Sequence, residues 1–134
     1  MPCRFCEHEK MKDAIVYSDE SVYVALSDNP LSYGHVLIVP RKHIERLEEL
    51  STDETVALFL VVKNMLPRLL KAVNACDYNL LINAGPTANQ SVFHLHIHVI
   101  PRGLHGNHLD AFFTAFEGKT NQLPKSALAK MGMG

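Results

Sequence analysis

Three histidines lie two residues apart in the stretch His94-Leu95-His96-Ile97-His98, and an apolar residue separates each pair. In an extended strand, residues i, i+2 and i+4 share a face, so the three imidazoles are predicted to line one side of a strand. With a rise of about 3.3 Å per residue, neighbouring histidines lie roughly 7 Å apart at Cα. This spacing leaves three interpretations open: a solvated polar face, a metal site or a nucleophilic site.

Each interpretation asks something different of the imidazoles. A solvated face has no need of histidine, because threonine, serine or lysine would serve there. A His-x-His pair with a third ligand could hold a catalytic zinc that keeps one position open for water. A neutral imidazole is also a good nucleophile towards phosphorus, and neighbouring imidazoles can orient it and shuttle protons. The ordinary histidine pKa of about 6.5 suits that last role.

Cys3 and Cys6 form the second group of residues that could do chemistry. A C-x-x-C spacing alone permits a redox couple, two unpaired structural thiols or a metal site. The surrounding sequence does not show the βαβ order of thioredoxin-like proteins, which argues against redox catalysis. The remaining cysteine, Cys76, has no partner in the sequence and is expected to be buried and inert.

Composition limits the class of protein that carries these residues. The chain has 134 residues, of which 47% are hydrophobic and 20% charged, and its formal net charge is −1. That length predicts a single domain, residues 1–134, whose core needs no disulfides. The balanced charge argues against a nucleic-acid polymer or a membrane surface as partner. The N-terminus lacks the apolar segment of a secretory signal and the cysteine count is odd, so we expect a cytoplasmic protein.

The elements that must position these residues follow an α+β order. Strand-like runs are predicted at residues 14–17, 22–27, 35–40, 78–84 and 91–101. One long helix is predicted from residue 52 to about residue 75, opened by a capping box of Ser51 and Glu54. This order favours an antiparallel sheet with the helix packed on one face.

The helix sequence also predicts which of its sides is buried. A mostly apolar stripe near period 3.6 is expected to face the sheet, and it comprises Val56, Phe59, Leu60, Lys63, Leu66, Leu70 and Val73. Pro67 lies inside the predicted helix and is expected to kink it or to divide it in two.

The segment from Gln90 to Ile100, QSVFHLHIHVI, resembles the signature of the histidine-triad (HIT) family, His-φ-His-φ-His-φ-φ with φ apolar. Residues 34–43, GHVLIVPRKH, resemble the other recognisable segment of that family, and Asn83 falls where the family places an asparagine. The resemblance covers about residues 3–103, so residues 104–134 are expected to form a less ordered C-terminal extension. It implies the HIT-like fold, an α+β domain with one long helix packed on an antiparallel sheet.

The resemblance also implies an activity. Family members bind a nucleotide, usually a purine one, and attack its α-phosphorus with the middle histidine, so that a covalent nucleotidyl-histidine forms and then releases a nucleoside monophosphate. Carried over residue by residue, His96 is the nucleophile, and His98, His35 and His94 complete the polar surroundings of the phosphate. The chemical step needs no metal. The expected substrate is a purine nucleoside phosphoramidate or a related nucleotidyl conjugate.

Three other functions remain open at this point. A dinucleoside polyphosphate hydrolase would use the same nucleophile with a different leaving group. A nucleotide-binding regulatory protein would need the residues that bind the nucleotide but would not need to hydrolyse it. A zinc metallohydrolase would hold a catalytic metal on His94, His96 and a third ligand.

The resemblance further implies contacts to the nucleotide. Asn83 and Ser91 are expected to hydrogen-bond the phosphate or the leaving group, and Gln90 is expected to line the phosphate pocket. The family often places an aspartate on the ribose hydroxyls at the position that Ser27 occupies here. Either Asp28 makes this contact after a small shift, or ribose recognition is weaker.

Many bacterial members of the family hold a structural zinc, and the corresponding ligands here are Cys3, Cys6, His43 and His94. Two thiolates and two imidazoles form a closed tetrahedral site, which would fix His94 by coordination. Family members are usually homodimers whose sheets join across the interface, so we expect a homodimer.

Overall fold

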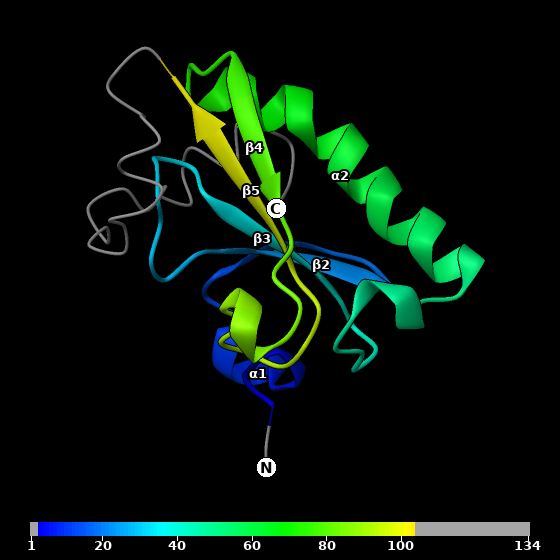
Figure 1. Cartoon of the computed structure of the whole chain (residues 1–134). Coiled ribbons are helices and arrows are strands. Elements are labelled where there is room, and N and C mark those ends of the chain that lie inside the picture. The colour runs from blue at the N-terminus through cyan, green and yellow to red at the C-terminus, as the bar shows by residue number, and fades with distance from the viewer. Residues whose placement is uncertain (1–2, 104–134) are drawn as a thin grey trace.

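The structure is a computed structural model that describes residues 3–103, so the expected C-terminal extension lies outside the described residues. The strands are β1 (Ile15–Ser18), β2 (Val22–Leu26), β3 (Val36–Pro40), β4 (Asp77–Leu81) and β5 (Ile97–Arg102). The helices are η1 (Arg4–Cys6), α1 (His8–Met11), η2 (Leu47–Glu49), α2 (Thr52–Ala72) and η3 (Pro86–Ala88). The strands form one antiparallel sheet in the order β1-β2-β3-β5-β4, and α2 runs along one face of it (Figure 1). The α+β architecture expected from the sequence is therefore confirmed.

Helix α2 begins where the sequence predicts. The hydroxyl of Ser51 accepts a hydrogen bond from the backbone N–H of Glu54 at 3.1 Å, and the Glu54 carboxylate accepts one from the N–H of Ser51 at 2.8 Å. This capping box satisfies backbone donors that a helix start leaves open. Pro67 is exposed and α2 continues through it, so the expectation of two separate helices is wrong. Within residues 3–103 no helix has both the length and the apolar character needed to cross a bilayer.

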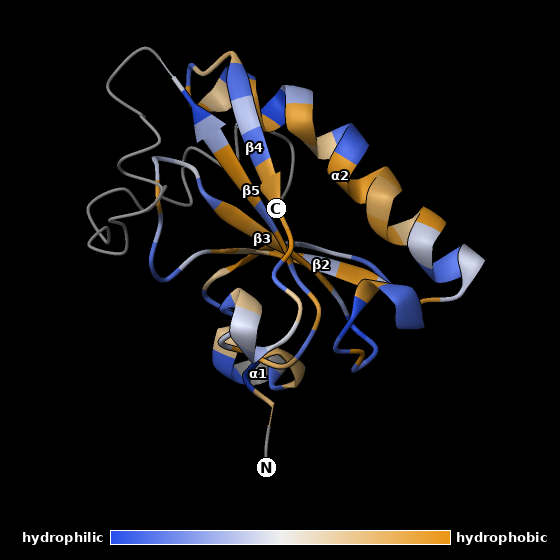
Figure 2. Ribbon diagram, viewed as in Figure 1, coloured by the Kyte–Doolittle hydropathy of each residue, from blue (hydrophilic) through white to orange (hydrophobic). Residues whose placement is uncertain are grey.

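The side of α2 that packs on the sheet differs from the predicted stripe. The buried residues of the helix, which pack against core residues of β2, β3 and β5, are Leu58, Val62, Met65 and Leu69. Three members of the predicted stripe, Val56, Phe59 and Leu60, are instead 51%, 36% and 48% exposed. Hydrophobic residues occur on several sides of α2 (Figure 2), so periodicity alone does not decide which row faces the sheet.

The N-terminal segment packs on the opposite face of the sheet. Phe5 joins Tyr23 and Leu37 in a buried cluster that is separate from the one beneath α2. The hydroxyl of Tyr23 donates to the carbonyl oxygen of Phe5 at 2.7 Å, which ties η1 to β2. The sheet therefore has α2 on one face and, on the other, the turn that carries Cys3 and Cys6.

Strand β5 is shorter than the strand predicted at 91–101. It begins at Ile97, because the residues before it direct their backbone groups elsewhere; the N–H of Leu95, for example, donates to the carbonyl oxygen of Ile44 at 2.6 Å. The first two histidines of the triad consequently precede the strand, and the third lies within it. The prediction of three imidazoles in a row on one strand is therefore wrong, because tertiary hydrogen bonds replace the sheet ladder over this stretch.

Strand β4 is one edge of the described sheet. It pairs with β5 in a register that places Leu80 opposite Val99, a residue of the core beneath α2. Directly opposite residues share a face, so Leu80 and its i−2 neighbour Tyr78 lie on the helix side of the sheet. Their side chains are nevertheless 43% and 45% exposed, which leaves an apolar edge next to α2 uncovered by the described residues.

Candidate functional site

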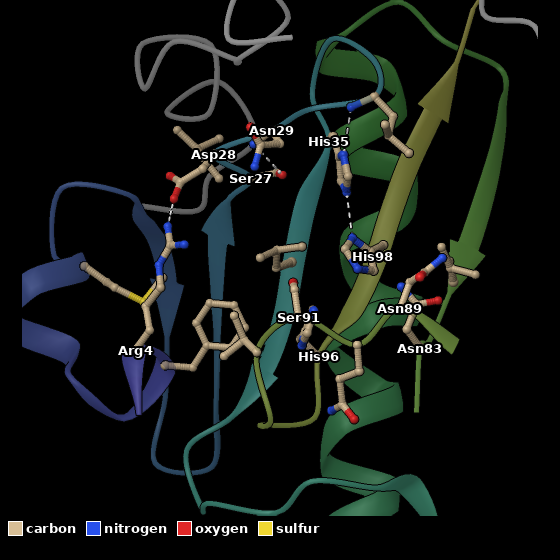
Figure 3. A pocket seen from close by; sticks show the side chains of 18 of the residues that line it. Arg4, Ser27, Asp28, Asn29, His35, Asn83, Asn89, Ser91, His96 and His98 are labelled. Atoms are coloured by element: carbon tan, nitrogen blue, oxygen red, sulfur yellow. Dashed lines mark hydrogen bonds and ion pairs between the residues drawn. The ribbon is translucent and has the colours of Figure 1, made fainter. Parts of the chain in front are cut away.

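A cavity of about 840 Å³ opens beside the start of β5, on the face of the sheet that carries the N-terminal segment. Its walls come from η1, the loop between β2 and β3, and the loop between β4 and β5. Figure 3 shows His35, His98, Asn83 and Asn89 on one side of this cavity and Asp28 on the other. Small-molecule sites in proteins commonly have volumes of roughly 300–1,000 Å³, so the cavity has the size of a ligand site.

A hydrogen bond to its own chain fixes the ring of His96 in this cavity. His96 is 5% exposed, and its Nδ1 lies 2.7 Å from the carbonyl oxygen of His94. A carbonyl oxygen can only accept, so Nδ1 carries the proton and Nε2 keeps its lone pair. The ring of Phe5 meets the imidazole edge-on, with centroids 4.9 Å apart. The imidazole of His96 is therefore fixed in orientation, and its Nε2 is the basic nitrogen.

His35 and His98 form a second hydrogen-bonded unit in the same cavity. The N–H of Leu31 donates to Nδ1 of His35 at 3.0 Å, and Nε2 of His35 lies 3.0 Å from Nδ1 of His98. Because Nδ1 of His35 accepts, the proton of the neutral ring is on Nε2 and is donated to Nδ1 of His98. The proton of neutral His98 is then on its own Nε2. A backbone N–H thus determines, through His35, which nitrogen of His98 is a donor.

Burial keeps all three cavity imidazoles neutral. Burial, together with the charges of His98, Arg102 and His96, lowers the pKa of His35 to about 3. Burial and the charge of His96 lower the pKa of His98 to about 4. Burial also lowers the pKa of His96, although the hydrogen bond to the carbonyl of His94 opposes this effect. The ordinary value near 6.5 expected from the sequence therefore does not apply, and the rings retain the lone pairs that nucleophilic chemistry needs.

Four of the other predicted nucleotide contacts line the same cavity: Asn83, Ser91, Ser27 and Asp28. Ser91 lines the cavity together with His96, and both are labelled in Figure 3. The hydroxyl of Ser27 accepts a hydrogen bond from the N–H of Asn29 at 3.2 Å, which shapes the loop between β2 and β3. The Asp28 carboxylate pairs with the guanidinium of Arg4.

Gln90 also lines the cavity, but its amide is occupied by the protein itself. Its Oε1 accepts a hydrogen bond from the N–H of Gly85 at 2.8 Å, and its Nε2 donates to the carbonyl oxygen of Glu45 at 3.0 Å. Gln90 is 4% exposed. Its side chain therefore holds the loop between β4 and β5 against the segment before η2, which shapes the wall of the cavity.

Sequence reasoning missed the contribution of the N-terminal turn to this cavity. Arg4 and Phe5 line it, although both lie between the cysteines that the sequence assigned to a metal. One signal was available: a turn that reaches His94 through its cysteines must also lie close to His96, two residues further along the chain.

The four residues predicted as zinc ligands come together in the structure. The ligand atoms of Cys3, Cys6, His43 and His94 all lie within 4.8 Å of one another. Nδ1 of His94 is 3.4 Å from Sγ of Cys3 and 3.5 Å from Sγ of Cys6, and Nδ1 of His43 is 3.2 Å from Sγ of Cys6. Ligands at bond lengths of about 2.0–2.3 Å around a tetrahedral zinc lie roughly 3.3–3.8 Å apart, so the donor set fits one metal ion.

The other ring nitrogen of His94 supports the same assignment. His94 is fully buried, and its Nε2 lies 2.7 Å from the carbonyl oxygen of Pro40. Nε2 therefore donates, and the lone pair is on Nδ1, which faces the thiols. Metal-binding histidines commonly donate their second nitrogen to a carbonyl in this way. The described residues that line the cavity of His96 do not include His94.

Cys76 is exposed, so the expectation that it is buried is wrong. It lies between the end of α2 and the start of β4, a connection that leaves its side chain accessible. All three cysteines lie within the described residues and are unpaired.

Residues 8–105 match the HIT domain family. The chain belongs to the HIT family. An uncharacterized HIT-like protein of Methanocaldococcus jannaschii is 39% identical over 75% of this chain and 78% of its own length. An adenylylsulfatase of Arabidopsis thaliana is 37% identical over 75% of this chain and 52% of its own length. A bifunctional bis(5'-adenosyl)-triphosphatase/adenylylsulfatase of the same organism is 34% identical over 81% of this chain and 61% of its own length.

Solved structures of HIT proteins share the fold described above. A hypothetical histidine triad nucleotide-binding protein of Sulfolobus tokodaii has a TM-score of 0.75 at 33% identity, over 96% of this chain and 88% of its own. A Zn-bound histidine triad family protein of Mycobacterium smegmatis has a TM-score of 0.69 at 23% identity, over 98% of this chain and 96% of its own, a likeness of fold alone. Both the family and the fold expected from the sequence are thus confirmed.

Proposed function

We propose that this HIT protein is a nucleotide hydrolase in which Nε2 of His96 attacks the α-phosphorus of a bound nucleotide. The observation that carries the proposal is the buried neutral ring whose Nδ1 donates to the carbonyl of His94, because it leaves Nε2 as the basic nitrogen in the cavity. Two relatives bear the names of nucleotide hydrolases, an adenylylsulfatase and a bis(5'-adenosyl)-triphosphatase, which supports this class of reaction.

The reaction consists of two displacements at phosphorus. In the first, the lone pair on Nε2 of His96 forms a P–N bond while the bond from phosphorus to the leaving group breaks, and the leaving group takes a proton from water. In the second, a water molecule attacks phosphorus and loses a proton, the P–N bond breaks, and its electron pair returns to Nε2. The product is a nucleoside monophosphate. Two displacements replace one difficult hydrolysis, which is the advantage of covalent catalysis.

The surrounding residues position and stabilise the phosphoryl group. The Nε2–H of His98, whose tautomer His35 determines, donates to a phosphoryl oxygen or to the leaving atom. Asn83 and Ser91, both in the loop between β4 and β5, hydrogen-bond the phosphate or the leaving group. Phosphoryl transfer depends mainly on such positioning and charge stabilisation.

The proposed substrate is a purine nucleoside phosphoramidate or a related nucleotidyl conjugate. A dinucleoside polyphosphate is the second candidate, favoured by the name of the bis(5'-adenosyl)-triphosphatase relative. Both substrates use the same nucleophile and differ in the leaving group. Values of kcat/KM for an adenosine phosphoramidate, adenylylsulfate and a diadenosine polyphosphate separate them. Equally slow turnover of all three would favour a nucleotide-binding regulatory protein instead.

Rapid base quench followed by mass spectrometry tests the covalent step. During turnover of an adenosine phosphoramidate, we expect a peptide containing His96 to gain the mass of one adenylyl group. The adduct should be stable to base and labile to acid, as a phosphoramidate is. The matched control is His96→Asn, which keeps a polar side chain of similar size and should show no adduct. Normal turnover without any adduct on His96 would contradict the proposal.

We also propose that Cys3, Cys6, His43 and His94 hold a structural zinc. When bound, the ion would join η1 to the segment before β5, and it takes no part in the displacements. A zinc metallohydrolase would need His94 and His96 on one metal. The Nδ1 of His94 faces the thiols, whereas His96 belongs to the cavity, which argues against that alternative.

The proposed assembly is a homodimer, and the proposed compartment is the cytoplasm. The exposed edge strand β4 has apolar side chains at Tyr78 and Leu80, and an unpaired edge can pair with its own copy to join two sheets. Three unpaired cysteines fit a reducing compartment.

A further inference from the structure

We propose that Arg4 and Asp28 read the edge of the nucleobase, and that guanine fits this pair better than adenine. The inference rests on the proposed function, because it takes the α-phosphorus to lie at His96. Arg4 comes from η1 and Asp28 from the loop between β2 and β3, and their guanidinium and carboxylate form an ion pair. Among the described residues that line the cavity, they are the two that carry a formal charge when histidine is neutral.

The pair lies at the part of the cavity away from the phosphate site. In Figure 3, Arg4 and Asp28 lie on one side of the cavity, and His98 and Asn83 on the other. The lining also contains an apolar group that suits the flat faces of a base, namely Met11, Leu26 and Leu37. A ribose separates the base from the α-phosphorus, so a nucleotide with its phosphate at the histidines would direct its base towards this group and the ion pair.

The side chains of Arg4 and Asp28 are exposed enough to contact a bound ligand. The side chains of Arg4 and Asp28 are 54% and 45% exposed. Ion pairs this accessible to water contribute little to the stability of the fold. Each of the two groups can therefore replace its contact with the other by a contact with a ligand at a small cost in free energy. The turn that carries Arg4 is anchored through Phe5, whose carbonyl oxygen accepts the hydrogen bond of Tyr23. The exposed guanidinium of Arg4 is thus carried by an anchored turn, which suits a role in ligand recognition.

The hydrogen-bonding capacity of the pair matches guanine. A carboxylate only accepts and a guanidinium only donates. Guanine presents the N1–H and the 2-amino group side by side, which the Asp28 carboxylate can accept together, and the neighbouring O6 can accept from Arg4. Adenine offers one amino donor on that edge, and its N1 is an acceptor that faces the carboxylate unfavourably. Hypoxanthine has the N1–H and O6 but no 2-amino group, so it should be intermediate.

Steady-state kinetics with three nucleoside phosphoramidates that share one amine leaving group test this proposal. We expect kcat/KM to fall in the order guanosine, inosine, adenosine, with the extremes about tenfold apart, as for other paired readings of a base edge. Asp28→Asn is expected to remove most of this difference, because an amide cannot accept both donors of guanine. Arg4→Met is expected to reduce the distinction between inosine and adenosine. Isothermal titration with guanosine and adenosine monophosphates repeats the comparison without turnover.

The matched control is Lys10→Gln, which removes an ion pair with Glu7 on the same N-terminal segment but outside the cavity lining. It should leave the order and the rates within about twofold, as surface substitutions usually do. A wild-type preference for adenosine overturns the proposal. So does an equal loss on all three nucleosides in Asp28→Asn, which would indicate a ribose contact.

His96→Asn, measured alongside, separates this inference from the proposed function. If His96→Asn abolishes turnover of all three substrates while Asp28→Asn preserves the wild-type order, base reading is wrong and the hydrolase stands. If His96→Asn leaves turnover intact, the proposed function itself fails.

Discussion

His94 and His96 are two residues apart and both are buried, yet their ring nitrogens meet different partners. In His94, Nε2 donates to the carbonyl of Pro40 and Nδ1 faces two thiols. In His96, Nδ1 donates to the carbonyl of His94 and Nε2 retains its lone pair. The partner of one ring nitrogen therefore decides what the other can do. One short segment of backbone thus contributes to two places, the Cys/His cluster that could hold a metal ion and the cavity that contains His96, and no side chain belongs to both.

The largest effect is expected when the proposed nucleophile in the cavity is removed. Replacement of His96 by Ala should lower kcat for an adenosine phosphoramidate by at least about a thousandfold, because no other group supplies the nucleophile. The metal content should remain that of the wild type, as measured by atomic emission. Retention of turnover within about tenfold would show that His96 is not the attacking group.

The second largest effect is expected when the proposed metal site is disrupted. His94→Ala, or removal of the metal by a chelator, should lower the melting temperature by about 10 °C, since roughly 2–3 kcal/mol of metal-linked folding energy corresponds to a shift of that size. The effect on kcat should be far smaller than that of His96→Ala. Calorimetry and initial rates on the same samples check both. Immediate loss of kcat on chelation with an unchanged melting temperature would point to a catalytic metal.

A smaller effect is expected when the hydrogen bond between His35 and His98 is removed. His35→Leu removes the partner that determines the tautomer of His98, and we expect kcat to fall about ten- to a hundredfold. If His35 acts through His98, the substitution should have little further effect in a His98→Ala background. A double-mutant cycle measures this coupling, and additive losses would mean that His35 has a role of its own.

Stability should also depend on pH in a direction that the cavity histidines determine. The pKa of His35 is lowered to about 3 and that of His98 to about 4, against about 6.5 in the unfolded chain. Below pH 6.5 the unfolded chain therefore takes up protons that the native state refuses, so this contribution to stability falls steadily towards pH 4. Urea midpoints of the metal-free protein at pH 7.5 and pH 5 measure the loss. A His35→Asn/His98→Asn variant should lose less, and an equal loss would place its origin elsewhere.

The smallest effect on either site is expected at the sheet edge. Leu80→Lys places a charge on β4 at a residue that belongs neither to the cavity lining nor to the Cys/His cluster. If two copies pair through β4, light scattering should show a shift from dimer towards monomer, because charged edges oppose strand pairing. Lys63→Gln, on the exposed side of α2, serves as the surface control. A dimer unaffected by Leu80→Lys would exclude this edge as the interface.

Much of the site was predictable because its chemistry depends on residue types at short spacings. The spacing of Cys3 and Cys6 and the HIT resemblance identified the four Cys and His residues that come close enough in the structure to hold a metal ion. The predicted contacts Asn83 and Ser91 line one cavity with the histidines. Gln90 was assigned to the phosphate pocket, and only the structure showed that its amide is committed to Gly85 and Glu45, because those partners are distant in the sequence or depend on a loop conformation.

The sequence by itself determined the α+β order, the HIT family and the residue types available for a nucleophile and a metal. It could not determine which apolar row of α2 faces the sheet, because several rows of that helix are hydrophobic. It also could not show that the strand begins only at Ile97, or that His94 and His96 turn their nitrogens to different partners. The start of the strand and the orientation of His94 depend on carbonyl oxygens and thiols from distant parts of the chain. The hydrogen bond of His96 to the carbonyl of His94 depends on the local backbone conformation, and only the tertiary structure shows either outcome.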